Sequence, residues 1–109
     1  MAYDTIMPNK ALLILDSKTI LEDGRIIQRR IWQLARTEPS RPHGFKYSLY
    51  CGIEGVTIVR YDNETGKGDH KHMGRAELEI AYNFTCLAQL LLDFVADIER
   101  RSGEIKWNA

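Results

Sequence analysis

Apolar residues near the C-terminus recur with the spacing of an α-helix. Counted from Leu87 they stand at offsets of 0, 3, 4, 7, 8 and 11, which makes one continuous stripe on a helix of 3.6 residues per turn. Thr85 is expected to cap the start of this helix, and Gly103 to end it just beyond two arginines. A helix with a single apolar stripe needs another layer to bury it, so the preceding chain must supply that layer.

The chain before this helix predicts antiparallel strands. Asp23-Gly24 stands between two apolar stretches, and this pair favours a hairpin because both central positions of a type I′ turn need a positive φ. A loop rich in Pro and Gly follows at 35–44, and beyond it polar and apolar residues alternate with the period of two that is typical of a strand. The two expected hairpins join residues 11–21 with 26–34 and residues 45–51 with 56–62.

These elements predict an α+β fold. Residues 62–74 show no apolar periodicity and contain three glycines, which indicates a loop, and alternation at 78–82 allows a fifth strand. We therefore expect an antiparallel sheet of four to five strands, arranged as two hairpins, with the C-terminal amphipathic helix packed on one face. The 109 residues are expected to form a single domain with its core at 11–101 and flexible ends at 1–9 and 103–109.

Apolar run lengths and cysteine spacing exclude several classes of protein. The longest purely apolar run, Ala11 to Leu15, has five residues, against the roughly 20 that a membrane-spanning helix needs. No basic segment followed by an apolar one stands near the N-terminus, so export is not expected and a cytoplasmic location is. Cys51 and Cys86 lie in apolar stretches without CxxC or Cys/His spacing, which favours reduced, buried thiols.

The formal net charge of zero conceals an uneven distribution. Residues 24–61 contain seven basic and two acidic side chains, for a net charge of +5, whereas residues 76–105 contain six acids and two bases, for −4. Overall balance argues against a protein that coats nucleic acid without specificity. It leaves room for a local basic site on the middle strands, although the segments could also simply neutralise one another.

The three histidines lie outside the expected core. His43 precedes the third strand, and His70 and His72 form an i, i+2 pair that points to one side wherever the backbone is extended. One hypothesis makes them the general acid and base of a metal-independent ribonuclease, which requires no cofactor. A second joins Asp69 to His70 and His72 as a metal site. In a third, the segment is a solvated loop without chemistry.

The ribonuclease hypothesis names further candidates. A positive side chain would stabilise the charge that develops on the phosphate, and a tyrosine beside basic residues could stack on a base. Tyr50 and Tyr61 are the exposed aromatic candidates, whereas Trp32 is expected to be packed. The candidate catalytic residues are His43, His70, His72 and Lys67, and the candidate substrate-binding residues are Lys46, Tyr61, Lys71, Arg75 and Arg29.

Several segments together resemble the TumE-like family of small bacterial toxins. The resemblance extends over roughly residues 11–101, and its most specific part is GKGDHKH, which follows YDNE. Here the third residue after Thr85 is Ala88, where relatives carry a Glu that completes a capping box. The matching segments are LEDG at 21–24, PHGFKY at 42–47, VRYDNE at 59–64 and GKGDHKH at 66–72.

The resemblance implies a cytoplasmic, growth-inhibiting toxin that acts on RNA and is silenced by a helix-turn-helix antitoxin. It makes the pairing of His43 with His70 or His72 the leading hypothesis for an active site, provided that both loops meet at one end of the sheet. The alternative from another class is a non-catalytic module that binds protein or nucleic acid through Arg25, Arg29, Arg30 and Lys46. The motif positions carried over from the family are His43, Lys46, Tyr61, Asp62, Asn63, Glu64, Lys67, Asp69, His70 and His72.

Overall fold

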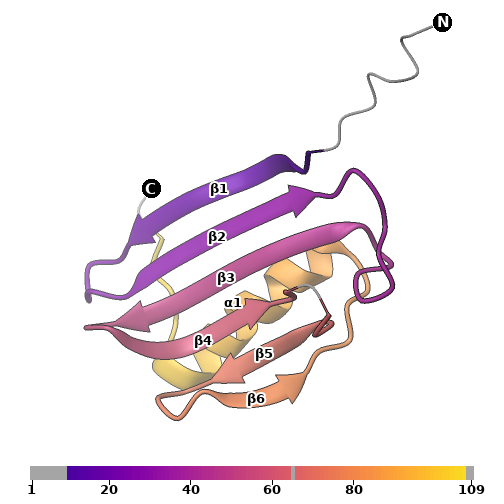
Figure 1. Cartoon of the computed structure of the whole chain (residues 1–109). Helices are drawn as coiled ribbons and strands as arrows, with labels where there is room; N and C mark the ends of the chain where they lie inside the picture. Colours follow the sequence, from indigo (N-terminus) through magenta and orange to yellow (C-terminus); the bar gives the residue numbers. More distant parts are fainter. Residues whose placement is uncertain (1–9, 65, 108–109) are drawn as a thin grey trace, which may run out of the picture.

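The structure, a computed structural model, describes residues 10–64 and 66–107. Within them one antiparallel sheet runs in chain order, each strand pairing with the next, and a single helix lies behind it in the view of Figure 1. The elements are β1 (Leu12–Ile20), β2 (Ile26–Gln33), β3 (Phe45–Ile53), β4 (Val56–Asp62), β5 (His70–Met73), β6 (Leu78–Ala81) and α1 (Leu87–Ser102).

The α+β prediction is confirmed, with both hairpins, the strand near 78–82 and the helix. The loop expected throughout 62–74 is wrong at its end, because residues 70–73 form β5 between β4 and β6. A strand of four residues, three of them polar or charged, has too little alternation to be recognised by itself. Its pairing partners on both sides determine its conformation, as is common for short strands.

The core lies between α1 and one face of the sheet. Leu90, Phe94 and Ile98 of the helix are fully buried, and Phe94 meets the ring of Tyr61 edge-on at 5.7 Å between centroids. Cys51 is buried in this layer as expected, but Cys86 is exposed and the expectation of a second buried thiol is wrong. Cys86 precedes the first turn of α1, where a side chain faces outward.

The two ends of α1 differ from each other in how they are capped. Gly103 ends the helix as predicted, with a φ of 93° and its N–H donating to the carbonyl of Glu99. The predicted cap at Thr85 is wrong, since Cys86 occupies the N-cap position and makes no side-chain capping bond. With Cys86 as N-cap, the third helical position is Gln89 and not Ala88, so the departure noted at Ala88 does not fall at the position that a capping box requires.

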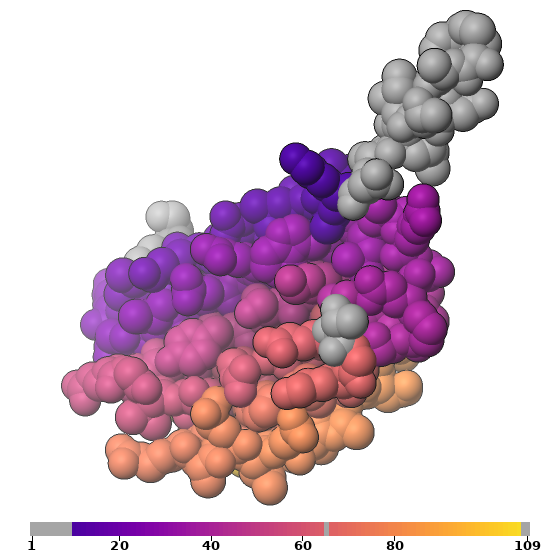
Figure 2. Space-filling model, in the orientation of Figure 1, coloured from indigo at the N-terminus to yellow at the C-terminus, as the bar shows by residue number. Residues whose placement is uncertain are grey.

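The pleat of the sheet divides its side chains between two faces. Odd-numbered residues of β2, β3 and β5, and of β4 from Val59 onward, point toward α1, and even-numbered residues point away from it; a bulge between Cys51 and Gly52 reverses this alternation at Val56 and Thr57. We call the second side the uncovered face; it is turned to the viewer in Figures 1 and 2. Within the described chain, no helix combines the length and the apolar character that crossing a bilayer requires.

The segment after α1 returns to the first hairpin. Ile105 is buried, and the guanidinium of Arg25 donates to the carbonyl oxygens of Gly103 and Glu104 at 2.8 and 2.9 Å. Thus Gly103 and Glu104, within the end expected to be flexible, make specific contacts with Arg25 just before β2. Residues 1–9, 108 and 109 lie outside the described residues.

Candidate functional site

Three side chains with chemical potential gather on the uncovered face. Asp62 is paired with His70 across β4 and β5, and His72 lies two residues further along β5 on the same face. The predicted common orientation of the two histidines is therefore confirmed, because the backbone that carries them is extended. Glu79 of β6 is paired with His72 and adds a second carboxylate. We refer to Asp62, His70, His72 and Glu79 as the His–carboxylate cluster.

Within the cluster, one nitrogen of each imidazole faces the carboxylates. Nε2 of His70 contacts Oδ1 of Asp62, and Nε2 of His72 lies 4.0 Å from the same oxygen. Oε1 of Glu79 lies 3.7 Å from Nε2 of His70 and 3.6 Å from that of His72. The side chains of Asp62 and the two histidines are largely buried, whereas 60% of the Glu79 side chain is exposed. Solvent therefore reaches the cluster on the side of Glu79, while its other three side chains are mostly shielded from solvent.

Backbone carbonyls hold the other nitrogen of each ring. Nδ1 of His70 lies 3.0 Å from the carbonyl oxygen of Gly68, and Nδ1 of His72 lies 3.4 Å from that of Glu77. A carbonyl oxygen can only accept, so a proton on Nδ1 satisfies these contacts and leaves the lone pair on Nε2. Both lone pairs then face the cluster.

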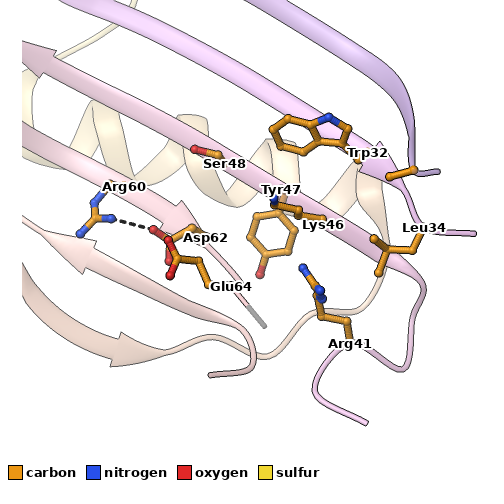
Figure 3. Close-up of a pocket in the computed structure, with 10 residues that line it drawn as sticks. Trp32, Leu34, Arg41, Lys46, Tyr47, Ser48, Arg60, Asp62 and Glu64 are labelled. Atoms are coloured by element: carbon orange, nitrogen blue, oxygen red, sulfur yellow. Dashed lines mark hydrogen bonds and ion pairs between the residues drawn. The ribbon is translucent and has the colours of Figure 1, made fainter. Parts of the chain in front are cut away.

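A hollow of about 690 Å³ adjoins the cluster on the uncovered face. Trp32 and Lys46 line one side of it, and the pair formed by Arg60 and Asp62 lines the other (Figure 3). The Lys46 ammonium lies 5.0 Å from the centroid of the Trp32 ring, and Arg60 donates to Oδ2 of Asp62 at 2.7 Å. Trp32 is therefore half-buried on a polar surface instead of belonging to the core.

His43 lies on the opposite face and does not meet the other histidines. Its Nδ1 accepts from the N–H of Phe45 at 3.1 Å, and its Nε2 lies 3.0 Å from Oδ1 of Asp69. The ring also stacks on Phe84, with 3.9 Å between centroids. The predicted partnership of His43 with His70 or His72 is not formed, because the sheet stands between them. Both ring nitrogens of His43 are already used inside the protein.

Asp69 belongs to the same internal network as His43. It accepts from the hydroxyl of Tyr47 at 2.7 Å and from the amide of Asn63 at 3.1 Å. Burial, followed by this bond to Asp69, raises the pKa of Tyr47 well above its ordinary value, so the phenol stays protonated. The metal triad expected from Asp69, His70 and His72 is therefore wrong in one member. Adjacent residues of a strand alternate between faces, and Asp62 occupies the place assigned to Asp69.

Three predicted substrate-binding residues also face away from the cluster. Tyr61 is fully buried and its hydroxyl donates to Asp97, so its ring offers no surface for stacking. Lys71 donates to the same carboxylate at 2.9 Å, and Nε of Arg29 lies 3.1 Å from the hydroxyl of Ser17. Burial, and next the bond to Asp97, raises the pKa of Tyr61 above its ordinary value. Tyr61 and Lys71 thus connect the sheet to α1, and Arg29 connects β2 to β1.

The remaining predicted cations have different locations. Lys46 lies on the uncovered face beside the hollow. Lys67 is exposed in the loop before β5 and lines a smaller hollow of about 330 Å³ together with His70 and Glu79. Arg75 is exposed in the turn between β5 and β6. Of the cations proposed for phosphate contact, Lys46 and Lys67 thus each line a hollow together with a residue of the cluster.

Sequence reasoning missed the roles of Arg60, Asp62 and Glu79 as neighbours of the two histidines. These residues come from β4 and β6, and their proximity depends on β5 lying between those strands. A usable signal existed, since residues 70–73 and 78–81 both border a Gly-containing turn that could form a hairpin. Extending the expected alternation through that turn would have placed Glu79 opposite His72.

Comparison with known proteins gives a family assignment over most of the chain. The sequence model of the family described as Toxin TumE matches residues 10–102, which include every strand, the helix and the whole His–carboxylate cluster. No curated protein matches the chain significantly, and neither does any solved structure.

Proposed function

The chain belongs to the TumE toxin family, and on this premise we propose that it is the toxin of a bacterial toxin–antitoxin pair that binds and cleaves RNA on the uncovered face of its sheet. The observation that carries this proposal is the junction of a basic, aromatic hollow with a cluster of two imidazoles and two carboxylates. The first part suits a nucleic acid and the second suits proton transfer or ion binding.

The hollow has the groups that a single-stranded RNA requires. An indole such as Trp32 can stack on any base, and cations such as Lys46 and Arg60 can contact the phosphates. Single strands are preferred because their bases can be splayed onto an aromatic surface. The open, shallow face of a sheet gives a strand room to lie across several of these groups.

The cluster is the proposed chemical centre. In RNA cleavage the 2′-hydroxyl loses its proton and attacks phosphorus, while the bond from phosphorus to the 5′-oxygen breaks. The 5′-oxygen then takes up a proton, which leaves a 2′,3′-cyclic phosphate and a 5′-hydroxyl. Asp62, His70, His72 and Glu79 place several groups for managing charge and protons within a few ångströms, and Arg60 or Lys46 would stabilise charge on the phosphate.

Substitution of His72 tests this assignment. We expect His72→Ala to lower the rate of cleavage of a purified RNA transcript by at least about 100-fold and to abolish growth inhibition on expression. Lys106→Ala, which removes an exposed cation from the tail after α1, serves as the control and should leave both unchanged. Cleavage that persists undiminished in His72→Ala would overturn the proposed centre.

Salt dependence distinguishes cleavage from simple binding. Lys46→Ala should weaken RNA binding across all sequences and reduce the slope of log affinity against log salt by about one. If the His72→Ala protein still retains RNA with an unchanged salt slope, binding and chemistry are separate functions of one face. If the unmodified protein retains RNA and never cleaves it, the chain is a binding module and not a ribonuclease.

The toxin assignment also predicts a partner. We propose a cytoplasmic helix-turn-helix antitoxin whose binding silences the toxin, as the family resemblance implies. Co-expression with the product of the neighbouring gene should restore growth, and the two proteins should co-purify. Growth inhibition that no neighbouring gene relieves would contradict this pairing.

A further inference from the structure

We propose that Asp62, His70 and His72 bind a divalent transition-metal ion, with Zn²⁺ as the first candidate. One carboxylate oxygen of Asp62 and one ring nitrogen of each histidine lie within 4.8 Å of one another. As a statement about the toxin's chemistry this inference rests on the function proposed above. Metal binding itself can be measured without RNA, so the two can fail separately.

The separations within the cluster suit a shared ion. Metal–ligand bonds of about 2.0–2.2 Å place tetrahedral ligand atoms roughly 3–3.6 Å from one another. Nε2 of His72 lies 4.0 Å from Oδ1 of Asp62, and both histidine nitrogens lie under 4 Å from Glu79. For an ion to be shared, the closer contact between His70 Nε2 and Asp62 Oδ1 must widen and the separation between His72 Nε2 and Asp62 Oδ1 must shorten.

The backbone presents both histidines as ligands. Carbonyl oxygens of Gly68 and Glu77 accept from the Nδ1 positions, and this contact leaves Nε2 of each ring as the atom with a lone pair. Metal-binding histidines typically donate their other N–H to a carbonyl or carboxylate, which fixes the ring and increases its basicity. The two rings share this arrangement although their carbonyl partners come from different segments. His43, by contrast, accepts with Nδ1 and turns Nε2 toward Asp69.

The buried carboxylate of Asp62 supports a bound cation independently of the histidines. The Asp62 residue is 8% exposed, and its Oδ1 is a buried oxygen that accepts no hydrogen bond among the described residues, although Nε2 of His70 contacts it and Arg60 donates to Oδ2. In neutral rings that carry their proton on Nδ1, the lone pairs of both Nε2 atoms face Oδ1, and three acceptors grouped in a buried place are costly. A proton on one ring could relieve a single contact, whereas one divalent cation could bind the Asp62 oxygen and both ring nitrogens at once.

The donor set indicates the kind of ion. Two imidazoles and one carboxylate suit Zn²⁺, Mn²⁺ or Fe²⁺, whereas Ca²⁺ and Mg²⁺ prefer oxygen ligands alone. Three protein ligands leave coordination positions open toward the exposed Glu79, as in catalytic sites. An ion there would neutralise charge on a phosphoryl oxygen. The imidazoles would then act as ligands, and Glu79 would be the carboxylate free to accept the proton of the 2′-hydroxyl.

Calorimetry with the full chain tests the site directly. After treatment with a chelator and its removal, titration with ZnCl₂ and separately with MnCl₂ should show one ion bound per chain. His72→Gln and Asp62→Asn should each lose affinity by more than about 100-fold, because loss of a ligand exceeds the effect of losing an outer partner. His43→Gln, the matched histidine control on the other face, should bind as the unmodified chain does. No uptake of either ion, or uptake unchanged in His72→Gln, would overturn the proposal.

A spectroscopic measurement avoids dependence on variants that fold poorly. Co²⁺ added to the unmodified chain should give the intense visible absorption of a tetrahedral site, and Zn²⁺ should displace it. Absence of this absorption together with absence of Zn²⁺ binding would exclude the site.

RNA cleavage then separates the two proposals. Cleavage that stops on metal removal and returns with the ion supports both. Cleavage that continues undiminished in fully metal-free protein overturns the catalytic role of the ion. Conversely, a His72→Gln protein that has lost the metal and still cleaves RNA overturns the proposed active centre and leaves the metal site standing.

Discussion

Asp97 is a carboxylate buried between α1 and the sheet. It accepts from the ammonium of Lys71 at 2.9 Å and also from the hydroxyl of Tyr61 and the guanidinium of Arg100. Burial alone raises its pKa, but these hydrogen bonds outweigh burial and hold the pKa below the ordinary value of 3.8. Asp97 therefore stays ionised and joins the helix to β4 and β5.

Removing this carboxylate should destabilise the fold. Asp97→Ala leaves the Lys71 ammonium and the Tyr61 hydroxyl without their acceptor, and we expect the free energy of unfolding at neutral pH to fall by about 3 kcal/mol. Urea denaturation measures this change. Asp16→Ala is the control, since its pair with Arg30 is about half exposed and should contribute less than about 1 kcal/mol.

The contribution of Asp97 should depend on pH. A carboxyl group whose pKa is lowered by folding stabilises the native state above its unfolded-state pKa, and this stabilisation is lost as the pH falls through the folded-state value. The difference in stability between the unmodified chain and Asp97→Ala should therefore narrow below the ordinary value of 3.8. A difference that stays constant into the acid range would contradict the assignment.

Gly52 of β3 is confined by two neighbours. A Cβ at this position would lie 2.0 Å from the hydroxyl oxygen of Tyr50 and 2.8 Å from the carbonyl oxygen of Val56. We expect Gly52→Ala to cost about 2 kcal/mol in chemical denaturation, because the backbone oxygen cannot move aside as the tyrosine can. Gly55→Ala has open space around it and a φ of +78°, and should cost only about 1 kcal/mol of backbone strain. Equal losses at the two glycines would argue against the steric account.

At the scale of elements, α1 gains its stability from packing and little from its N-terminus. Its buried stripe of Leu90, Phe94 and Ile98 lies against the sheet. The first turn contains no acidic residue, and Cys86 has the extended conformation of an N-cap without making the capping bond. The orphan N–H groups of the first turn are therefore available to a better cap.

Cys86→Ser should supply that cap. The Ser hydroxyl can accept from the N–H of Gln89, and Gln89 stands at the third helical position, which would complete a capping box. We expect stability to increase by about 1 kcal/mol in thermal or urea denaturation. Cys51→Ser is the informative contrast. Burial raises the pKa of the Cys51 thiol to about 11, and placing a hydroxyl in the same apolar surroundings costs free energy. It should destabilise, and a gain at Cys51 or a loss at Cys86 would contradict the reasoning.

β5 is the element on which the candidate site depends. It places His70 and His72 between Asp62 on one neighbouring strand and Glu79 on the other. The same strand directs Lys71 to the opposite face, where it meets Asp97. One four-residue strand therefore contributes to the proposed chemistry and to the attachment of the helix, which explains why its polar sequence is compatible with a position inside the sheet.

At the scale of the whole molecule, the tail after α1 closes the fold. Arg25 is buried and donates to Ser102, Gly103 and Glu104, and Ile105 fills the layer beneath the first hairpin. The helix packs on β4, whereas the tail passes behind the sheet toward β1 (Figure 1), so the tail covers part of the sheet that α1 does not reach.

Truncation of the tail's apolar side chain tests its role. Ile105→Ala should lower the free energy of unfolding by about 2 kcal/mol, because it removes buried apolar groups and leaves a cavity. Lys106→Ala, next to it and exposed, should change stability by less than about 0.5 kcal/mol. Unchanged stability in Ile105→Ala would show that this side chain is dispensable, and a loss confined to Lys106→Ala would contradict the assigned role of Ile105.

The two faces of the sheet have different roles. The covered face contains the apolar core and the internal networks of Asp69 and Asp97. The uncovered face presents the hollow lined by Trp32, Lys46 and Asp62 (Figure 3), and Asp62 belongs also to the His–carboxylate cluster. The basic middle segment seen in the charge distribution thus contributes to both faces: Lys46 and Arg60 to the proposed site, and Arg25 and Arg29 to structural contacts.

The sequence by itself determined the elements whose periodicity is local. The α1 stripe and the strands of the two hairpins were predictable because each buries one face, and the spacing of apolar residues records that face directly. The common side of His70 and His72 followed from the same alternation once the backbone is extended. The sequence also identified the two histidines as candidate site residues, because imidazoles spaced two residues apart are suited to proton transfer or metal binding.

Only the tertiary structure decided which side chains meet. Asp62 instead of Asp69 joins the histidines, His43 lies behind the sheet, and Tyr61 is buried, because strand register and pleat assign neighbouring residues to opposite faces. That assignment depends on β5 pairing with both β4 and β6, and its four residues carry too weak a pattern to predict the pairing. Distances between residues far apart in sequence arise from such pairings, which no local pattern contains.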